Sequence, residues 1–125
     1  MNTSIEVIER WKCLINSEQV LPGKMLSNLD VNLYLDARDC SKDFSEKCLG
    51  LWGQSEQLIL DSTFEELHQL IFKKCTLALG VTELSCYIAE DIELLVRCEA
   101  TGLEDTFLSS LTTAYLSGRL PLLTL

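Results

Sequence analysis

Basic residues are scarce in this sequence. Ten lysines and arginines stand against 19 acidic residues in a chain of 125, which gives a net charge of −9 at pH 7 and an isoelectric point near 4.5. Nucleic-acid backbones and anionic lipid surfaces repel a protein with such a field. The bases are also scattered, because Lys73 and Lys74 are the only adjacent pair. We therefore expect no direct contact with nucleic acid and none with a membrane.

Long apolar runs and export patterns are lacking as well. No segment approaches the roughly 18 consecutive apolar residues that cross a bilayer. The first residues, Met1 to Glu6, lack the basic and then apolar pattern of a signal peptide, so we expect a cytoplasmic protein. The six cysteines form no C-x-x-C motif, which argues against a zinc ribbon or a thioredoxin-like site. In the cytoplasm we expect them to be reduced thiols that pack as small core residues.

Signatures of catalysis are few. His68 is the only histidine, and the sequence has neither a Gly-rich phosphate loop nor a G-x-S-x-G elbow. Carboxylates gather at Glu90, Asp91 and Glu93, but neighbouring residues of a helix point about 100° apart and do not close a metal site by themselves. The sequence thus predicts no catalytic residue, no metal and no cofactor. The alternative is a small enzyme or metal-binding protein that uses Glu90, Glu93 and His68.

Helical periodicity is what the sequence has in abundance. Hydrophobic residues make up 47% of the chain, enough for a core, and most of them recur at helical spacing. This predicts an all-α fold, with residues 1–125 forming a single helical domain that is a small bundle of about five helices. The predicted helices cover roughly residues 4–19, 41–52, 62–79 and 82–100, and a last helix opens at a capping box of Thr101 and Glu104.

The segment 29–37 leaves two interpretations open. Its apolar residues alternate with polar ones, which is typical of a half-buried strand, and residues 57–60 are the obvious partner for a short hairpin. Asn and Asp are poor strand formers, however, and Ser27 with Asp30 is able to cap a short helix instead.

The helix predicted over 82–100 carries two apolar faces. Leu84, Ile88, Ile92, Leu95 and Val96 complete a core stripe, yet further apolar residues fall outside it. We name as candidate partner-binding residues an aromatic and an aliphatic side chain, a thiol and the acids beside them: Tyr87, Glu90, Asp91, Leu94 and Cys98. In this interpretation Tyr87 and Leu94 face solvent until a partner covers them. In the competing one, this helix is central in the bundle and its neighbours cover both faces.

The function that fits best is a non-catalytic protein-binding module of the adaptor, chaperone or inhibitor type. Its partner is a protein, a second copy of the chain being one form of it, and an acidic, partly apolar helical face binds that partner. The alternative within the same class is an acidic inhibitor that mimics nucleic acid and blocks a basic protein. In composition the chain is similar to secretion chaperones, toxin-neutralising immunity proteins and phage-encoded inhibitors. Composition alone does not choose among them.

Overall fold

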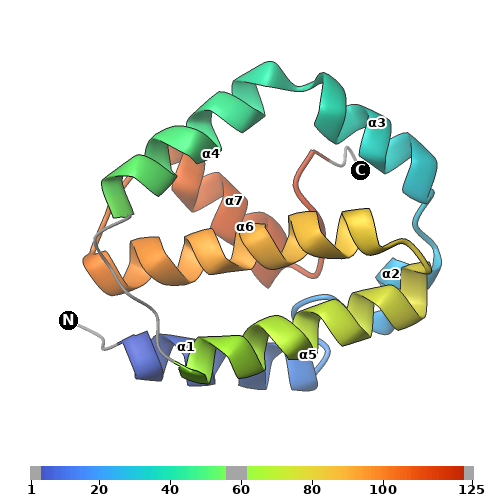
Figure 1. Cartoon of the computed structure of the whole chain (residues 1–125), viewed down its shortest axis with the longest axis horizontal. Helices are drawn as coiled ribbons and strands as arrows, with labels where there is room; N and C mark the ends of the chain where they lie inside the picture. Colours follow the sequence, from blue (N-terminus) through green and yellow to red (C-terminus); the bar gives the residue numbers. More distant parts are fainter. Residues whose placement is uncertain (1–3, 56–61, 123–125) are drawn as a thin grey trace.

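A computed structural model describes residues 4–55 and 62–122, and within them the chain forms helices and no strand (Figure 1). The all-α class is therefore confirmed. The described part holds seven helices, because two short ones, α2 and α3, add to those expected. Their bounds are α1 Ser4–Asn16, α2 Gly23–Ser27, α3 Val31–Cys40, α4 Lys42–Ser55, α5 Ser62–Leu79, α6 Thr82–Thr101 and α7 Thr106–Leu116.

Helix α6 lies at the centre of the molecule. It packs against α1, α4 and α5, and Figure 1 shows it between the pair α1 and α5 on one side and the arch of α3 and α4 on the other. Every residue of the predicted core stripe is at most 2% exposed, which confirms the predicted phase of this helix; the stripe is Leu84, Ile88, Ile92, Leu95 and Val96.

The strand interpretation of residues 29–37 is wrong. The main part of this segment belongs to α3, whose N-cap is Asp30: the carboxylate accepts a hydrogen bond from the backbone N–H of Leu33 at 3.1 Å. Tyr34 faces the core at 2% exposed, whereas Leu33 is 67% exposed, the opposite of what the alternating pattern requires. A side-chain cap and helical burial of one aromatic therefore outweigh the alternation. The expected partner, residues 57–60, lies outside the described residues.

The turns around α6 explain a second difference from the sequence prediction. Gly80, at φ +71°, separates α5 from α6 as expected for a glycine that ends a helix. The Thr101–Glu104 capping box, however, is wrong, because Thr101 still belongs to α6 and its hydroxyl donates to the carbonyl of Arg97. The N-cap of α7 is Asp105, whose carboxylate accepts from the N–H of Leu108 at 3.1 Å.

The beginning of the apolar C-terminal tail docks on the body. Leu120 and Pro121 are buried, and they line the same hollow as Phe107 and Leu111 of α7. In the ranges 4–55 and 62–122, no helix combines the length and the apolar character needed to cross a membrane.

Candidate partner-binding site

The five predicted partner-binding residues lie partly inside the molecule. Leu94 and Cys98 are fully buried and Asp91 is 4% exposed, while Tyr87 is half-buried and Glu90 is exposed. All but Cys98 line one cleft of about 250 Å³ between α4 and α6. The expectation that Leu94 faces solvent in the isolated chain is therefore wrong, because α4 already covers that side of α6.

Asp91 is compensated within the core. The Arg38 guanidinium donates two hydrogen bonds to its carboxylate, at 2.5 and 2.9 Å, and the Tyr115 hydroxyl donates a third at 2.5 Å. Burial is the main cause of the raised pKa of Tyr115, and the negative charge of Asp91 adds to it. The Asp91 carboxylate therefore links three helices, α3, α6 and α7. These hydrogen bonds compensate its charge, which explains how α6 carries an acid on a face that its neighbours cover.

The aromatic side chains around the α4–α6 cleft already have cationic partners. The Arg38 guanidinium lies 4.8 Å from the ring centre of Phe44 and 5.1 Å from that of Tyr87. The Tyr87 hydroxyl donates towards Asp39 at 3.2 Å, and Arg97 lies 5.0 Å from the ring centre of Trp52. The aromatic rings of this cleft are therefore already paired with other side chains of the protein. Only the outer edge of the cleft is open to a partner.

Two of the three residues of the enzyme alternative share a hollow, and the third lies elsewhere. His68 and Glu93 line a shallow hollow of about 330 Å³, but Glu90 belongs to the α4–α6 cleft. The His68 ring stacks on Phe72, and Glu93 accepts a hydrogen bond from Arg97 at 3.0 Å. No group of three or more metal-ligating side chains is found within the two described ranges.

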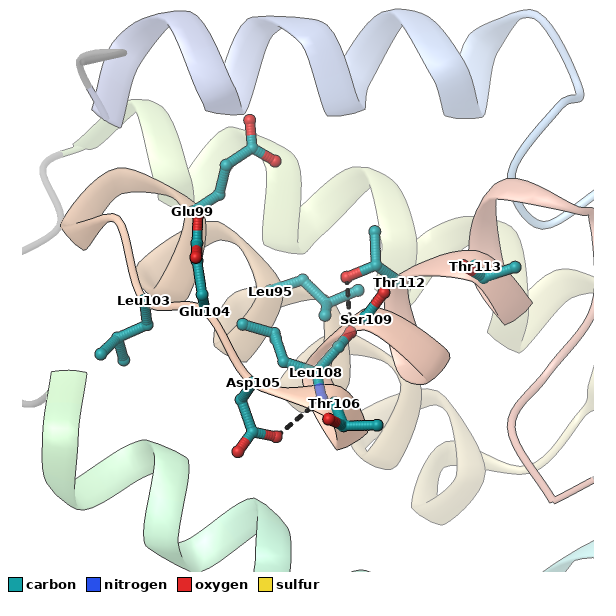
Figure 2. A pocket seen from close by; sticks show the side chains of 10 residues that line it. All are labelled: Leu95, Glu99, Leu103, Glu104, Asp105, Thr106, Leu108, Ser109, Thr112 and Thr113. Atoms are coloured by element: carbon teal, nitrogen blue, oxygen red, sulfur yellow. Dashed lines mark hydrogen bonds between the residues drawn. The ribbon is translucent and has the colours of Figure 1, made fainter.

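A larger groove, of about 750 Å³, opens between the C-terminal half of α6, the loop 102–105 and α7 (Figure 2). We call it the α6–α7 groove. Apolar side chains, hydroxyl groups and carboxylates line it in separate zones: Leu95, Leu103 and Leu108; Thr106, Ser109, Thr112 and Thr113; Glu99, Glu104 and Asp105. Leu95 and Leu108 are buried and form an apolar floor at the centre of the groove, whereas the half-buried Leu103 projects from the loop away from them (Figure 2).

The carboxylates at this groove differ in their partners. Figure 2 shows Glu99 pointing towards α1, where it forms an ion pair with Arg10. Asp105 points the other way and caps α7 through the N–H of Leu108. Glu104 is exposed and forms no ion pair with any residue of the described ranges.

The outer face of α7 carries no charge. All eleven residues of the helix are uncharged, and the exposed ones that border or flank the groove are Thr106, Ser109, Ser110 and Thr113. The inner face is apolar, with Leu108, Leu111 and Tyr115 buried. Of the described residues that line the groove, none is a histidine, cysteine or lysine. The arrangement is suited to binding.

Comparison with known protein families identifies the chain. A family model described as Immunity protein PIM1 matches residues 11–122. The chain belongs to this family. The match includes α2 to α7 and the last part of α1, residues 11–16, so both the α4–α6 cleft and the α6–α7 groove lie within it. No curated protein and no solved structure matches the chain.

Sequence reasoning missed the groove of this PIM1 family member. It placed the interface on α6 alone, whereas α7 supplies much of the groove wall. A usable signal was present, because residues 106–118 form an uncharged run between Asp105 and Arg119 in a chain that is 23% charged. Charged residues are depleted at the centres of protein interfaces, so such a run on a surface helix indicates a docking face.

Proposed function

We propose that this chain is an immunity protein that binds a protein toxin and neutralises it without catalysis, with the α6–α7 groove as the docking site. The observation that carries the proposal is the groove itself, where an apolar floor meets the uncharged, hydroxyl-lined face of α7. Membership of the PIM1 immunity-protein family supports a partner of the toxin class.

The side chains of α7 suit an interface for an energetic reason. Ordering a long charged side chain in an interface costs about 0.5–1.5 kcal/mol, whereas serine and threonine have few rotamers to lose. Their hydroxyls both donate and accept, so they adapt to polar groups of a partner. Docking against Ser109 and Thr113 therefore costs little entropy and buries no unpaired charge.

The cleft between α4 and α6 contributes a second, smaller surface to this proposal. Of the five residues named from the sequence, Tyr87 and Glu90 reach solvent, and the exposed Leu49 lies at the same cleft. We propose that these side chains lie at the rim of the interface and contact the partner there. The other three residues, Leu94, Asp91 and Cys98, are buried. They therefore support this surface only by holding α6 in place.

Capture followed by reconstitution tests the proposed function. The tagged chain is used to recover its partner from its own source cells, and the recovered polypeptide is then purified and mixed with the chain. We expect a one-to-one complex, loss of toxicity, and an unchanged intact mass of the toxin after the complex is dissociated. A toxin altered in mass would contradict a non-catalytic mechanism, and a partner without toxic activity would contradict the immunity role.

The site is tested by blocking it. Ser109→Trp places a bulky side chain at the groove from an exposed position of α7, and Asn32→Trp on the exposed face of α3 is the matched control. We expect the groove variant to weaken toxin binding by about tenfold or more, because central contacts dominate an interface, and the control to bind like the unmodified chain. Equal affinity of both variants would place the toxin elsewhere. Thermal melts establish that both variants fold.

Nucleic-acid mimicry stays an alternative form of inhibition. A net charge of −9 permits it. A mimic would bind its basic partner mainly through long-range charge, so its affinity would collapse at high salt. Docking on an apolar floor keeps much of its affinity under the same conditions, and a salt titration of the reconstituted complex separates the two.

A further inference from the structure

The charge balance around the α6–α7 groove is incomplete. Arg10 neutralises Glu99, and Asp105 uses one carboxylate oxygen to cap α7. Glu104 stands between them on the loop with no ion-pair partner in the described ranges. Two basic side chains near this loop have other partners, because Arg97 pairs with Glu93 at 3.0 Å and Lys47 lies 5.6 Å from the ring centre of Phe107 in a neighbouring hollow. A negative potential therefore remains at this end of the groove.

The shape of the groove matches one class of side chain. A lysine or arginine combines an aliphatic stem with a charged head, and such a side chain gains most where an apolar surface ends at a carboxylate. The groove has this order, because the floor of Leu95 and Leu108 lies beside the loop that carries Glu104 (Figure 2). The hydroxyls of Ser109 and Thr113 on the opposite wall are able to accept hydrogen bonds from the remaining donors of the head or of a backbone.

We infer that the groove receives a lysine- or arginine-bearing segment of the toxin, with the charged head at Glu104 and the stem along Leu95 and Leu108. This inference rests on the proposed function and adds to it the chemistry of the docking element. Its basis is the complementarity between a cationic, amphipathic side chain and a groove whose described lining carries carboxylates and no basic residue.

Charge reversal at Glu104 is the test, with the purified toxin recovered from the source cells as the probe. Glu104→Lys places a positive charge beside the basic side chain of the toxin, so we expect the dissociation constant to rise by at least about tenfold. Glu104→Gln only removes the negative charge, so we expect it to cause a smaller rise. Asp36→Lys is the matched control, because Asp36 is an exposed acid of α3, at the other end of the molecule from the loop 102–105 (Figure 1). We expect it to change the affinity little.

A second substitution, in the toxin, completes the experiment. Replacing its basic residues one at a time by glutamate identifies the one whose reversal restores binding to Glu104→Lys. If Glu104→Lys binds as the control does, or more tightly, the inference is overturned while the proposed function stands. If the recovered partner has no toxic activity, the proposed function fails first and this inference fails with it. If Ser109→Trp binds normally, the groove is not the docking site and the inference also fails.

Discussion

Asp91 shows at the scale of a single residue how α6 accommodates an acid on a covered face. Removal of one partner from a buried ion pair costs about 3–5 kcal/mol, because the other charge is left without compensation. Arg38 and Tyr115 together supply three hydrogen bonds to this carboxylate. The Tyr34 hydroxyl, in contrast, is buried without a hydrogen-bond partner of ordinary geometry in the described ranges.

The two tyrosines give a matched prediction. Tyr115→Phe removes a donor to a buried carboxylate, so we expect it to lower the free energy of unfolding by about 1.5–3 kcal/mol. Tyr34→Phe removes a buried hydroxyl that has no hydrogen bond of ordinary geometry in the described ranges, so we expect little loss or a small gain. Denaturant unfolding of both variants measures the difference. Equal losses would show that the hydroxyl of Tyr115 contributes nothing specific.

Burial also predicts how stability changes at alkaline pH. Burial raises the pKa of Tyr34 and of the Cys48 and Cys75 thiols to about 12. The folded chain therefore keeps protons that the unfolded chain releases, and the stability from this source is complete below about pH 9 and lost as the pH rises towards 12. Urea midpoints across this range measure the decline, and Tyr34→Phe should flatten its upper part. A constant midpoint up to pH 12 would contradict the prediction.

At the scale of the helix, the start of α3 depends on one N-cap contact. Its inner side holds one fully buried apolar residue, Tyr34, while Val31 and Leu35 are only partly buried against the core. The N-cap contact of Asp30 therefore has a large share in fixing its start.

Loss of that cap is predicted to weaken the helix. Asp30→Ala should lower the free energy of unfolding by about 1 kcal/mol, the usual cost of losing an N-cap, and should increase amide exchange in the first turn of α3. Asp36→Ala, an exposed acid within the same helix, is the control and should change stability by less than about 0.5 kcal/mol. Equal effects would mean that the cap does not set the start of α3.

The face of α6 that meets α4 gives a second prediction for an element. Leu94 is fully buried, so Leu94→Ser should lower the free energy of unfolding by about 2–5 kcal/mol. Leu49→Ser, at an α4 leucine that is 69% exposed, is the control and should cost far less. If Leu94→Ser instead left thermal stability intact and weakened toxin binding, the original interpretation of Leu94 as an interface residue would return.

The sequence was sufficient for the long helices and insufficient for the interface. Periodicity and Gly80 located α5 and α6, because each has a complete apolar stripe of its own. The α6–α7 groove arises from two helices and the loop between them, so neither helix alone reveals it. Leu94 was misjudged for a similar reason, since only the placement of α4 shows that this part of the second face of α6 is covered.

At the scale of the whole molecule, the exposure of the six thiols shows which parts of the bundle solvent reaches. All six cysteines are free, with Cys13, Cys40 and Cys86 exposed, Cys48 half-buried, and Cys75 and Cys98 buried. Burial raises the pKa of the Cys48, Cys75 and Cys98 thiols, which lowers their reactivity further.

Thiol labelling therefore has a predicted pattern. Under native conditions at about pH 8, three cysteines should react fast and the other three slowly, while denaturation without a reductant should make all six available. Mass spectrometry of the labelled peptides identifies which ones react. Rapid labelling of Cys98 would show that α6 is not the closed centre of the bundle, and fewer than six reactive thiols after denaturation would reveal disulfides.

The uncharged face of α7 has a practical consequence for mapping the complex. The last lysine of the chain is Lys74, so neither α6 nor α7 offers a primary side-chain amine. Amine-to-amine crosslinkers, the common reagents of structural mass spectrometry, will report no contact of the proposed docking face even if a bound partner covers all of it. Carbodiimide coupling, which joins a carboxylate directly to a lysine, is the suitable chemistry, and Glu104 is the side chain at which a crosslink to the toxin should form first.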